Sequence, residues 1–592
     1  MTDTLQHARV LSPRRNTSEA SSVAELVSEQ LRHFGIDENS DYGQALSRTA
    51  SHLYDAQSDV MSLWDITNKT LGTLGKEDRM AYFNAKKFLS FQMAKVLDTL
   101  QNPFRKTYQS LSSGNGAQGH YPLFDNVTAL FSATPVVVRT ATYIYACTEW
   151  VDDAFQGKEA THQIYSRLLN PTNISLANAI VDLEAGPYAG DYLAWNFNSG
   201  MAAIDGVLSN VLTHGDVLIV SRNVYGGVYQ LLHDYFAREN RLNIQIAWFD
   251  GYTKEEFSRF LADTRQQNQG RLDKGASLHV YLESPCNPHG YVLDVPGITV
   301  EAHAVGALVM LDSTLATPVL HQPLQHPDKM ARPDYVMHSY TKDICGSGAT
   351  TAGVVIGETY RMFQPKGSSM NGVEWSQTLF WDVYYIKGAF LDSEKAFDVL
   401  NGMKTLEQRL MSKVINTLIF TEFLNAHPQI RVNSHAVAKH ENASLREQLH
   451  NNGWPCPLFT VDMAPAQLSK AVFTSFFDSL EPAFSHQVSI GQTNTIILCP
   501  ALTSHSELST EEQKKAGIEL TTMRIAMGTD NVKQLMAQFI LAARHFIEPA
   551  APGFCAAFLA PAEIDDIYRR VCMQVCEQYH GGVASMTEVL QE

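Results

Sequence analysis

The chain has 592 residues, of which 45% are hydrophobic and 18% charged, an ordinary balance for a globular protein of about two to four domains. Its 45 basic and 62 acidic side chains give a formal charge of −17, which argues against a nucleic-acid partner or an anionic membrane surface, because both attract basic surfaces. No run of about 18 apolar residues predicts a membrane span, no basic-then-apolar start predicts a secretion signal, and the eight scattered cysteines favour a reduced, cytoplasmic protein without a metal site.

The first 120 residues are predicted to form a helical extension. Residues 1–20 are polar and typical of a mobile tail. Apolar residues recur at helical spacing from Lys76 to Leu100, and the Gly/Ser-rich segment 110–119 is typical of a linker. Because a long exposed apolar helix face is costly, we expect the extension to pack on the rest of the chain or on a neighbouring subunit.

Between about residues 175 and 357, short apolar runs alternate with helical stretches such as Gly227–Arg238 and Lys254–Gln267. This alternation is typical of an α/β fold with a mostly parallel sheet that helices cover on both faces. Such sheets bind ligands at the carboxyl ends of their strands. The predicted strands are Val217–Ser221, Ile244–Trp248, Leu278–Leu282, Ala307–Leu311, Tyr335–His338 and Gly353–Ile356.

The remaining chain is predicted to hold an insert, a long helix and a second α/β region. Residues 358–390 are rich in aromatic residues and irregular, one helix is expected from about Asp392 to Asn425, and the pattern is again α/β over 426–548. We therefore predict three domains: a helical extension over 1–120, a large ligand-binding domain over 121–390 that includes the insert, and a smaller C-terminal domain over 391–592 with a tail after 549.

Lys342 follows a predicted strand in the segment Ser339-Tyr-Thr341-Lys342. Hydroxyls and backbone N–H groups on a turn bind phosphate, and an amine beside them can bond to a phosphorylated aldehyde such as pyridoxal 5'-phosphate (PLP). The pattern S-x-x-K also occurs in serine acyl-transfer enzymes, where Ser339 would be the nucleophile and Lys342 its base, but the companion S-D-N and K-T-G motifs do not occur. Taken alone, the tetrapeptide is more typical of a solvated turn.

Two further strand ends carry polar side chains that suit the same ligand. Asp312 follows five apolar residues, so its carboxylate needs a partner, which a protonated pyridine nitrogen or a structural ion pair would supply. Glu283 begins Glu-Ser-Pro-Cys-Asn287-Pro, and an Asn before Pro is held extended, so the Asn287 amide can face a fixed group such as a phenolic oxygen. An ordinary turn would also explain the second segment.

Two glycine-containing segments precede these. Ser199-Gly200-Met201 starts a predicted helix, whose N-terminus either binds phosphate or is simply capped by the serine. Tyr225 lies just past the first predicted strand, where its ring could stack on a cofactor.

Together these segments resemble the Cys/Met-metabolism PLP enzymes, which include cystathionine γ-synthase, cystathionine γ- and β-lyase, methionine γ-lyase and O-acetylhomoserine sulfhydrylase. Nine segments keep the family order over roughly residues 130–548. They are Y-S-R-L-L-N-P-T (165–172), S-G-M-A-A-I (199–204), V-Y-G-G-V-Y (224–229), E-S-P-C-N-P (283–288), L-D-S-T-L-A-T-P (311–318), H-S-Y-T-K (338–342), M-K-T-L-E-Q-R (403–409), S-H-S-E-L-S (504–509) and M-R-I-A-M-G-T-D-N (523–531).

The resemblance implies the fold type I architecture of PLP-dependent transferases, with a mostly parallel seven-stranded sheet and a smaller α/β C-terminal domain. It implies that Lys342 holds PLP covalently and moves protons. Asp312 would pair with the pyridine nitrogen and Asn287 would face the phenolic oxygen. Tyr225 would stack on the ring and is, with Lys342, a candidate catalytic residue. The implied phosphate ligands are Gly200, Met201, Ser339 and Thr341.

The resemblance also implies shared active sites. Tyr165 and Arg167 would reach the phosphate of a neighbouring subunit, so a homodimer or homotetramer is expected. Arg524 would bind the α-carboxylate of an amino-acid substrate, a task that suits a guanidinium group, and Ser489 would contact the substrate.

Several positions depart from the family pattern. Asp343 stands where the family usually has Tyr, and Ser347 and Ala349 occupy the places of a His and an Asp. Asn401 replaces an Arg, and Gly227 stands where methionine γ-lyases carry a reactive cysteine, which disfavours that activity.

These departures indicate a divergent PLP-dependent transferase or lyase of the trans-sulfuration type. The expected reaction is γ-replacement or γ-elimination on a homoserine-derived or sulfur-containing amino acid. The alternatives are a C–S β-lyase for cystathionine-like substrates, γ-substitution with a non-standard donor, and a PLP-fold protein used as a binding or regulatory module.

Overall fold

The computed structural model describes residues 19–70, 75–111, 132–143, 145, 148–158, 164–503 and 517–581. The chain divides into two compact units, one of residues 1–134, 144–164 and 584–592 and the other of residues 135–143 and 165–583. Most of the predicted linker (112–119) and all of the motif at 504–509 lie outside the described residues. The three-domain division stays a prediction.

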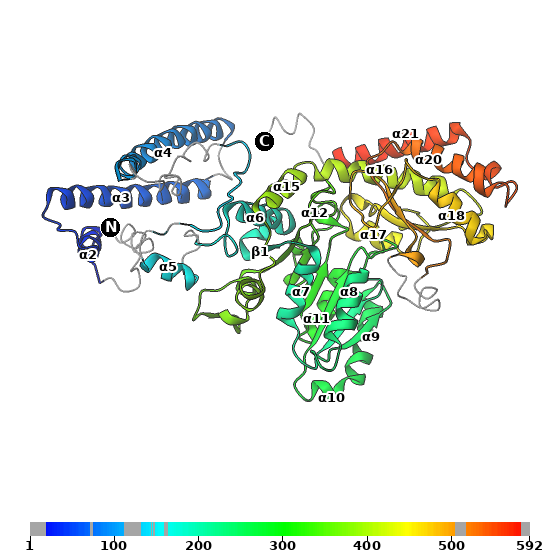
Figure 1. Ribbon diagram of the computed structural model, residues 1–592, viewed down its shortest axis with the longest axis horizontal. Helices are drawn as coiled ribbons and strands as arrows, with labels where there is room; N and C mark the ends of the chain where they lie inside the picture. Colours follow the sequence, from blue (N-terminus) through cyan, green and yellow to red (C-terminus); the bar gives the residue numbers. More distant parts are fainter. Residues whose placement is uncertain are drawn as a thin grey trace. The chain divides into compact units, whose positions relative to one another are not determined.

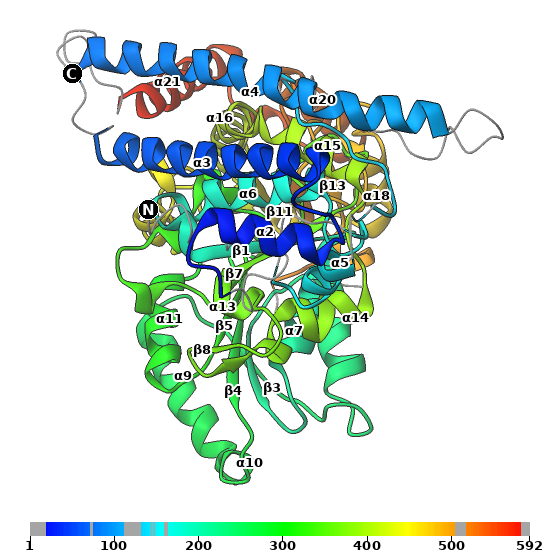
Figure 2. The same ribbon diagram turned by 90° about the vertical axis from the view of Figure 1, so that its left-hand side faces the viewer.

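The first unit is helical in its described part, which agrees with the helical extension expected from the sequence. Its helices are α2 (Val23–His33), α3 (Asp41–Thr70), α4 (Lys76–Leu111) and α5 (Thr148–Phe155). Helix α2 begins at a Ser22 cap and packs against α3 (Figure 2), and its Leu26 lies in a buried cluster that Tyr54 of α3 contacts.

The second unit is built on a seven-stranded sheet with the strand order β1-β7-β6-β5-β4-β2-β3. Neighbouring strands from β3 to β6 are parallel, whereas β7 is antiparallel to both β6 and β1. This confirms the predicted mostly parallel sheet. The strands are β1 (Tyr192–Phe197), β2 (Val217–Ser221), β3 (Gln245–Phe249), β4 (Leu278–Glu283), β5 (Val309–Asp312), β6 (Tyr335–His338) and β7 (Gly353–Glu358).

The strand β1 was not among the predicted strands. Its sequence Tyr-Leu-Ala-Trp-Asn-Phe lacks the β-branched residues that mark the other strands, and it follows directly on a short 3-10 helix, Gly186–Asp191. It lies at the sheet edge, where it pairs with β7 in antiparallel register from Tyr192–Glu358 to Phe197–Gly353.

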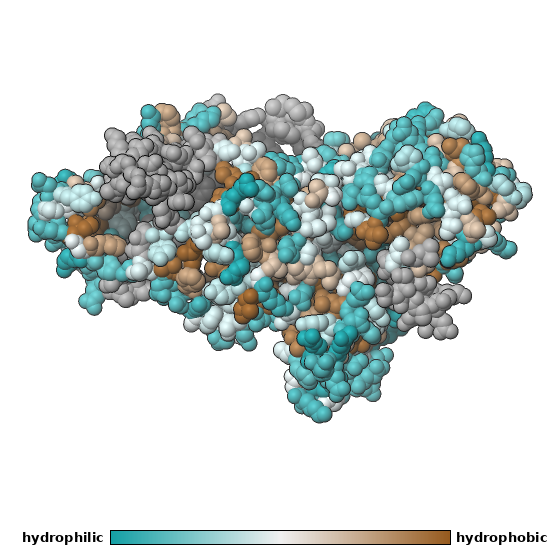
Figure 3. Space-filling view, in the orientation of Figure 1, coloured by the Kyte–Doolittle hydropathy of each residue, from teal (hydrophilic) through white to brown (hydrophobic). Residues whose placement is uncertain are grey.

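Helices cover both faces of this sheet, as a parallel sheet requires. All five residues of β2 are buried. Leu218 and Val220 pack on the side of α7 (Gly200–Val211), whereas Val217 and Ile219 pack on the side of α9 (Lys254–Gln267) and α11 (Val295–Ala304), and Figure 2 shows the strands between these helices. Helix α9 turns a hydrophilic surface outward (Figure 3).

The long helix expected from Asp392 to Asn425 is in fact two helices, α15 (Ser393–Met403) and α16 (Leu406–Asn425). Gly402 packs against the backbone of Cys345 so closely that a Cβ atom there would lie 2.2 Å from the Cys345 carbonyl oxygen. Immediately afterwards, the Thr405 hydroxyl donates to the Gly402 carbonyl oxygen at 3.3 Å. The close contact and the local hydrogen bond turn the chain between the two helices.

A five-stranded sheet with the order β10-β11-β14-β13-β12 follows. Helices α16, α20 (Val532–Ala542) and α21 (Pro561–His580) lie along one side of it (Figure 1). The strands are β10 (Arg431–Asn433), β11 (Leu458–Asp462), β12 (Ser485–His486), β13 (Ile496–Leu498) and β14 (Met523–Ala526). Among the described residues, no helix combines the length and hydropathy that crossing a membrane requires.

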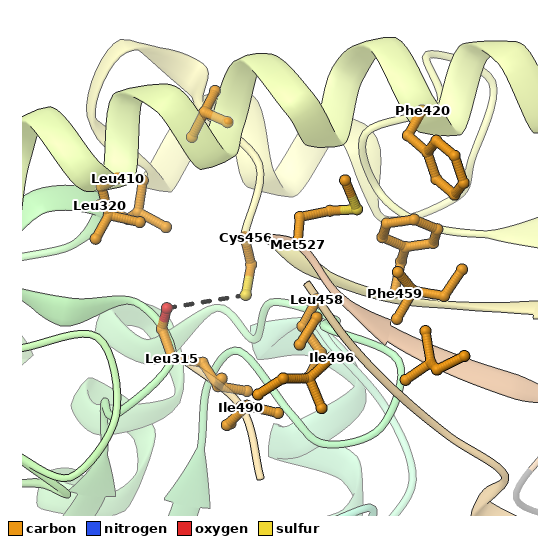
Figure 4. Close-up of a cluster of buried hydrophobic side chains, with 14 of the residues drawn as sticks. Leu315, Leu320, Leu410, Phe420, Cys456, Leu458, Phe459, Ile490, Ile496 and Met527 are labelled. Carbon is orange, nitrogen blue, oxygen red and sulfur yellow. Dashed lines mark hydrogen bonds between the residues drawn. The ribbon is translucent and has the colours of Figure 1, made fainter. Parts of the chain in front are cut away.

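One apolar core joins the two sheets of the second unit. Phe420 of α16 lies beside Phe459 of the five-stranded sheet and Leu410 of the same helix lies beside Leu320, and the cluster extends to Leu458 and to Leu315 just after β5 (Figure 4). The Cys456 thiol donates to the Leu315 carbonyl oxygen at 3.8 Å across this core. The core therefore fixes the five-stranded sheet against the ends of β5 and β6, where the predicted ligand site lies.

Candidate active site

Polar side chains from neighbouring strand ends meet in a cavity of about 210 Å³. Glu283 ends β4 and pairs in register with Asp312 at the end of β5, and Lys342 lies in the turn after the next strand, β6. The β14 residue Arg524 and the nearby Ser489 close the cavity from the other sheet. Ten of the predicted site residues line this one cavity, namely Gly200, Met201, Tyr225, Asn287, Asp312, Ser339, Thr341, Lys342, Ser489 and Arg524.

The Lys342 amine is held inside the cavity. Its Nζ atom donates to the Ser489 hydroxyl oxygen at 3.1 Å. Burial and the nearby Arg524 cation lower the pKa of Lys342 to about 8, and the Asp343 and Asp312 carboxylates act in the opposite direction. At such a pKa roughly a tenth of the amines is unprotonated at pH 7, far more than for an ordinary lysine, and the unprotonated form is what a nucleophile or general base requires.

Asp312 lies on the floor of the cavity with only 7% of its surface exposed. Its Oδ1 atom accepts a hydrogen bond from the Thr314 N–H at 3.0 Å, and burial raises the pKa of its carboxyl group. Among the described residues, no ion pair involves Asp312. A buried carboxylate without an ion-pair partner among the described residues fits a ligand that brings its own positive charge, such as a protonated ring nitrogen.

The start of α7 forms an anion cradle at one side of the cavity. The Ser199 hydroxyl caps the helix by accepting from the Ala202 N–H at 3.1 Å. A Cβ atom on Gly200 would lie 2.7 Å from the Ser339 Cβ, so only glycine lets the helix approach the turn after β6 this closely. The first N–H groups of a helix have no intrahelical acceptor, and they favour a phosphate.

The Arg524 guanidinium group is preorganised at the opposite side. Its Nη1 donates to the Asn287 amide oxygen at 3.0 Å, and its Nη2 donates to the Ser489 carbonyl oxygen at 2.6 Å. Its Nε is buried without a hydrogen-bond partner among the described residues. Burial lowers the pKa of Arg524 to about 10, which leaves the group cationic at neutral pH and suited to an anionic ligand.

Glu283 supports two residues of the cavity, although sequence analysis gave it no role beyond its strand-end position. Its carboxylate accepts from the Tyr225 N–H at 2.7 Å and from the Asn287 N–H at 3.1 Å. Burial, and then the neighbouring Asp312, raise the pKa of Glu283 well above its usual range.

His338 also lines the cavity, and sequence analysis gave it no role. Its Nε2 lies 3.0 Å from the Glu184 carboxylate, and both side chains are fully buried. Its position within H-S-Y-T-K could have marked His338 as a site residue. Its pairing with Glu184 could not be predicted in this way, because Glu184 is 154 residues away in the sequence.

Tyr165 and Arg167 do not join the Lys342 cavity. They line a separate cavity of about 170 Å³ together with Asn170 and Phe390. The Arg167 Nη1 donates to the Tyr385 carbonyl oxygen at 2.6 Å, and its guanidinium carbon lies 5.6 Å from the centre of each of the Tyr165 and Tyr385 rings. Their expected role in a neighbouring subunit stays a prediction.

Comparison with known proteins identifies the family. Residues 125–543 match the family model described as Cys/Met metabolism PLP-dependent enzyme. The chain belongs to this family. It is therefore a PLP-dependent enzyme of Cys/Met metabolism with the fold type I architecture.

Its relatives carry several activities. The chain is similar to L-methionine γ-lyase of Fusobacterium nucleatum subsp. polymorphum (29% identity over 405 residues, 68% of this chain and 91% of that protein). It is similar to O-acetyl-L-homoserine sulfhydrylase of Leptospira meyeri (26% over 429 residues, 67% and 89%). In fold it resembles the solved structure of a putative O-acetylhomoserine (thiol)-lyase of Campylobacter jejuni that contains a pyridoxyl-lysine phosphate (TM-score 0.58, 24% identity, 70% and 96%).

The residues of the Lys342 cavity fit PLP. A buried carboxylate without an ion-pair partner, a glycine-lined helix start and an amine of lowered pKa match a ring cation, a phosphate and an aldehyde respectively.

Proposed function

We propose that this PLP enzyme catalyses γ-replacement or γ-elimination on a homoserine-derived or sulfur-containing amino acid. The observation that carries the proposal is the pairing of Arg524, with an unpartnered Nε, and the Lys342 amine in one cavity, both tied to Ser489. An amino acid whose α-carboxylate is bound at Arg524 would present its α-hydrogen to Lys342. The names of the relatives, a γ-lyase and a homoserine-ester sulfhydrylase, support chemistry at the γ carbon.

Bound PLP supplies an electron sink for the charge that develops when the α-proton leaves. We propose that Lys342 holds it covalently, that Asp312 pairs with its ring nitrogen, that Asn287 faces the phenolic oxygen and that Tyr225 stacks on the ring. Its phosphate would be bound by Gly200, Met201, Ser339 and Thr341 of this subunit and by Tyr165 and Arg167 of a second one. The active form would then be a cytoplasmic homodimer or homotetramer.

Lys342 would also move the protons of the reaction. The Lys342 amine, freed from the cofactor when the amino group of the substrate takes its place and held by the Ser489 hydroxyl, would take the substrate α-proton and could return a proton to the leaving group or to carbon. A pKa of about 8 suits both directions, since the amine exchanges protons readily near neutral pH.

Arg524→Lys is expected to raise the KM for the amino acid by about 10- to 100-fold, because a charge-assisted hydrogen bond contributes about 1.5–3 kcal/mol and lysine lacks the planar fork. The turnover number at saturating substrate is expected to change less than kcat/KM. Steady-state kinetics with one amino-acid substrate measures both. Arg431→Lys, at an arginine whose side chain is 67% exposed, is the matched control. A KM equal to that of the wild type would remove Arg524 from carboxylate binding.

Product analysis tests the reaction itself. The PLP-loaded enzyme is incubated with O-acyl-homoserines, cystathionine and methionine, with and without a thiol. We expect 2-oxobutyrate or a four-carbon adduct, which report γ chemistry. Pyruvate as the sole oxo acid from cystathionine would instead assign the protein as a C–S β-lyase.

Methionine is expected to be the weakest of these substrates. Gly227 stands where methionine γ-lyases carry a cysteine, and a Cβ atom there would lie 2.7 Å from the Tyr225 ring.

A further inference from the structure

A fully buried ion pair lies directly behind Lys342. The Lys413 Nζ is 2.6 Å from the Asp343 Oδ1, and the two side chains are 0% and 2% exposed. Lysine and aspartate are almost never fully buried unless they are paired, because desolvating an uncompensated charge is costly. Asp343 directly follows Lys342 in the chain. The buried pair therefore lies immediately beside the residue that carries the amine of the cavity.

The helix that supplies Lys413 also holds the backbone of the same turn. Arg409 lies one turn earlier on α16, and its guanidinium group donates to the carbonyl oxygens of Asp343 at 2.7 Å and Gly402 at 2.8 Å. Gly346 has a φ of +69°, and a Cβ atom there would lie 2.1 Å from the Arg409 Nη1. The turn after Lys342 thus packs closely against α16, and two cations of this helix, Arg409 and Lys413, contact Asp343.

A second segment holds the turn from the other side. Gly491 has a φ of +77°, and a Cβ atom there would lie 2.6 Å from the Asp343 nitrogen and 2.8 Å from the Lys342 Cβ. Ser489, two residues earlier, accepts from the Lys342 amine. The Lys342–Asp343 peptide is therefore enclosed between the 489–491 segment and α16, and the Asp343 side chain points away from the cavity toward Lys413.

We propose that Asp343 and Lys413 are a positioning pair for Lys342, which fixes the backbone behind the reacting amine and offsets part of the charge of the carboxylate next to it. The inference rests on the proposed role of Lys342 as the PLP-binding and proton-transferring residue. Without Lys413, the adjacent carboxylate would favour the protonated, inactive form of the amine. Without Asp343, the Lys413 cation would disfavour the protonated form of the Lys342 amine.

Other charged groups face these residues, and they are unchanged in the variants below. Arg524 on β14 lowers the pKa of the Lys342 amine, and Asp312 on β5 raises it. Arg409 faces Asp343 from α16, and the Cys456 thiol faces it from the five-stranded domain, where burial raises the pKa of the thiol and keeps it neutral. His338 lowers the pKa of Asp312 electrostatically, against the larger effect of burial.

The test is a double-mutant cycle with Asp343→Asn, Lys413→Met and the double variant, all loaded with PLP. The readouts are the pH midpoint of the visible absorbance of the bound PLP and the acid limb of kcat/KM. We expect the midpoint of Lys413→Met to rise by about one pH unit and that of Asp343→Asn to fall, because a nearby charge shifts a pKa by about that much. The double variant is expected to return close to the wild-type midpoint.

The surface pair Lys533–Asp565 provides the control, because it has the same 2.6 Å separation but joins α20 to α21 with both side chains nearly half exposed. Lys533→Met and Asp565→Asn are expected to leave the midpoint unchanged. Should Lys413→Met not fold, Asp343→Asn and the double variant give the same comparison.

Equal midpoints in the wild type, Asp343→Asn and the double variant would overturn the inference, and would leave the pair a purely structural one even if thermal stability fell. Such a result is distinguishable from failure of the proposed function. If the proposed role of Lys342 itself were wrong, borohydride reduction of the wild type would leave no PLP label on the Lys342 peptide.

Discussion

Lys342→Ala is expected to abolish covalent PLP binding and to lower turnover by at least about 10³-fold, the largest effect of any single substitution in this chain. The substitution removes the amine that bonds to the cofactor and also the base that moves the α-proton. The amine contacts Ser489 inside a cavity and does not lie in the close-packed core, so the fold is expected to survive its loss. The visible absorbance of the purified protein and the mass of the Lys342 peptide after borohydride reduction measure the first effect.

Lys254→Ala is a suitable control, because Lys254 makes a surface ion pair with Glu301 on α9 and α11. It should keep both the absorbance and the activity. Retention of a reducible PLP label in Lys342→Ala would place the covalent link on another lysine. An acyl label on Ser339 that depends on Lys342 would instead favour the serine acyl-transferase alternative.

The parallel core of the fold could be predicted from the sequence because its strands are short, continuous apolar runs. Strands β2, β4 and β6 begin at the residues at which the prediction began them, and β5 ends at the carboxylate that the prediction placed just past the strand. The edge strand β1 lacked that pattern, because it pairs with β7 alone and its Leu193 and Trp195 are only partly buried. The break between α15 and α16 depends on the contact of Gly402 with Cys345, which lies 57 residues earlier in the chain.

The cavity could be predicted for a related reason. Ligand-binding groups at parallel strand ends are adjacent in space whenever the strands are adjacent. The proximity of Asp312 and Lys342 could therefore be predicted without knowing the conformation of the loops. The supporting charges could not be predicted. Lys413 occupies an ordinary position in a helical pattern, and only the approach of α16 to the turn after β6 makes it the partner of Asp343. The same holds for Glu184, which reaches His338 from α6 (Pro171–Ala185).

Asp312→Asn is expected to lower turnover by about 10²- to 10⁴-fold while PLP stays bound. The asparagine amide keeps the shape of the side chain and an oxygen that can accept from the Thr314 N–H, so the loss is confined to the negative charge. Leaving a buried cation without its partner costs about 3–5 kcal/mol, and a loss of that size in the reacting state corresponds to the stated factor. Asp312→Glu retains the charge and is expected to be impaired less. Turnover at saturating substrate, normalised to bound PLP, is the measurement.

The same substitution should affect stability in opposite directions in the two forms of the protein. Without PLP, the Asp312 carboxylate is buried without an ion-pair partner among the described residues, and its removal relieves a desolvation cost. The Tm of the PLP-free Asp312→Asn protein is therefore expected to equal or exceed that of the PLP-free wild type. With PLP, the wild type gains the ring-nitrogen pair and the variant does not, so the rise in Tm on adding PLP should be smaller in the variant. An equal rise in both proteins, with turnover retained, would mean that the ring nitrogen is paired with a group other than Asp312.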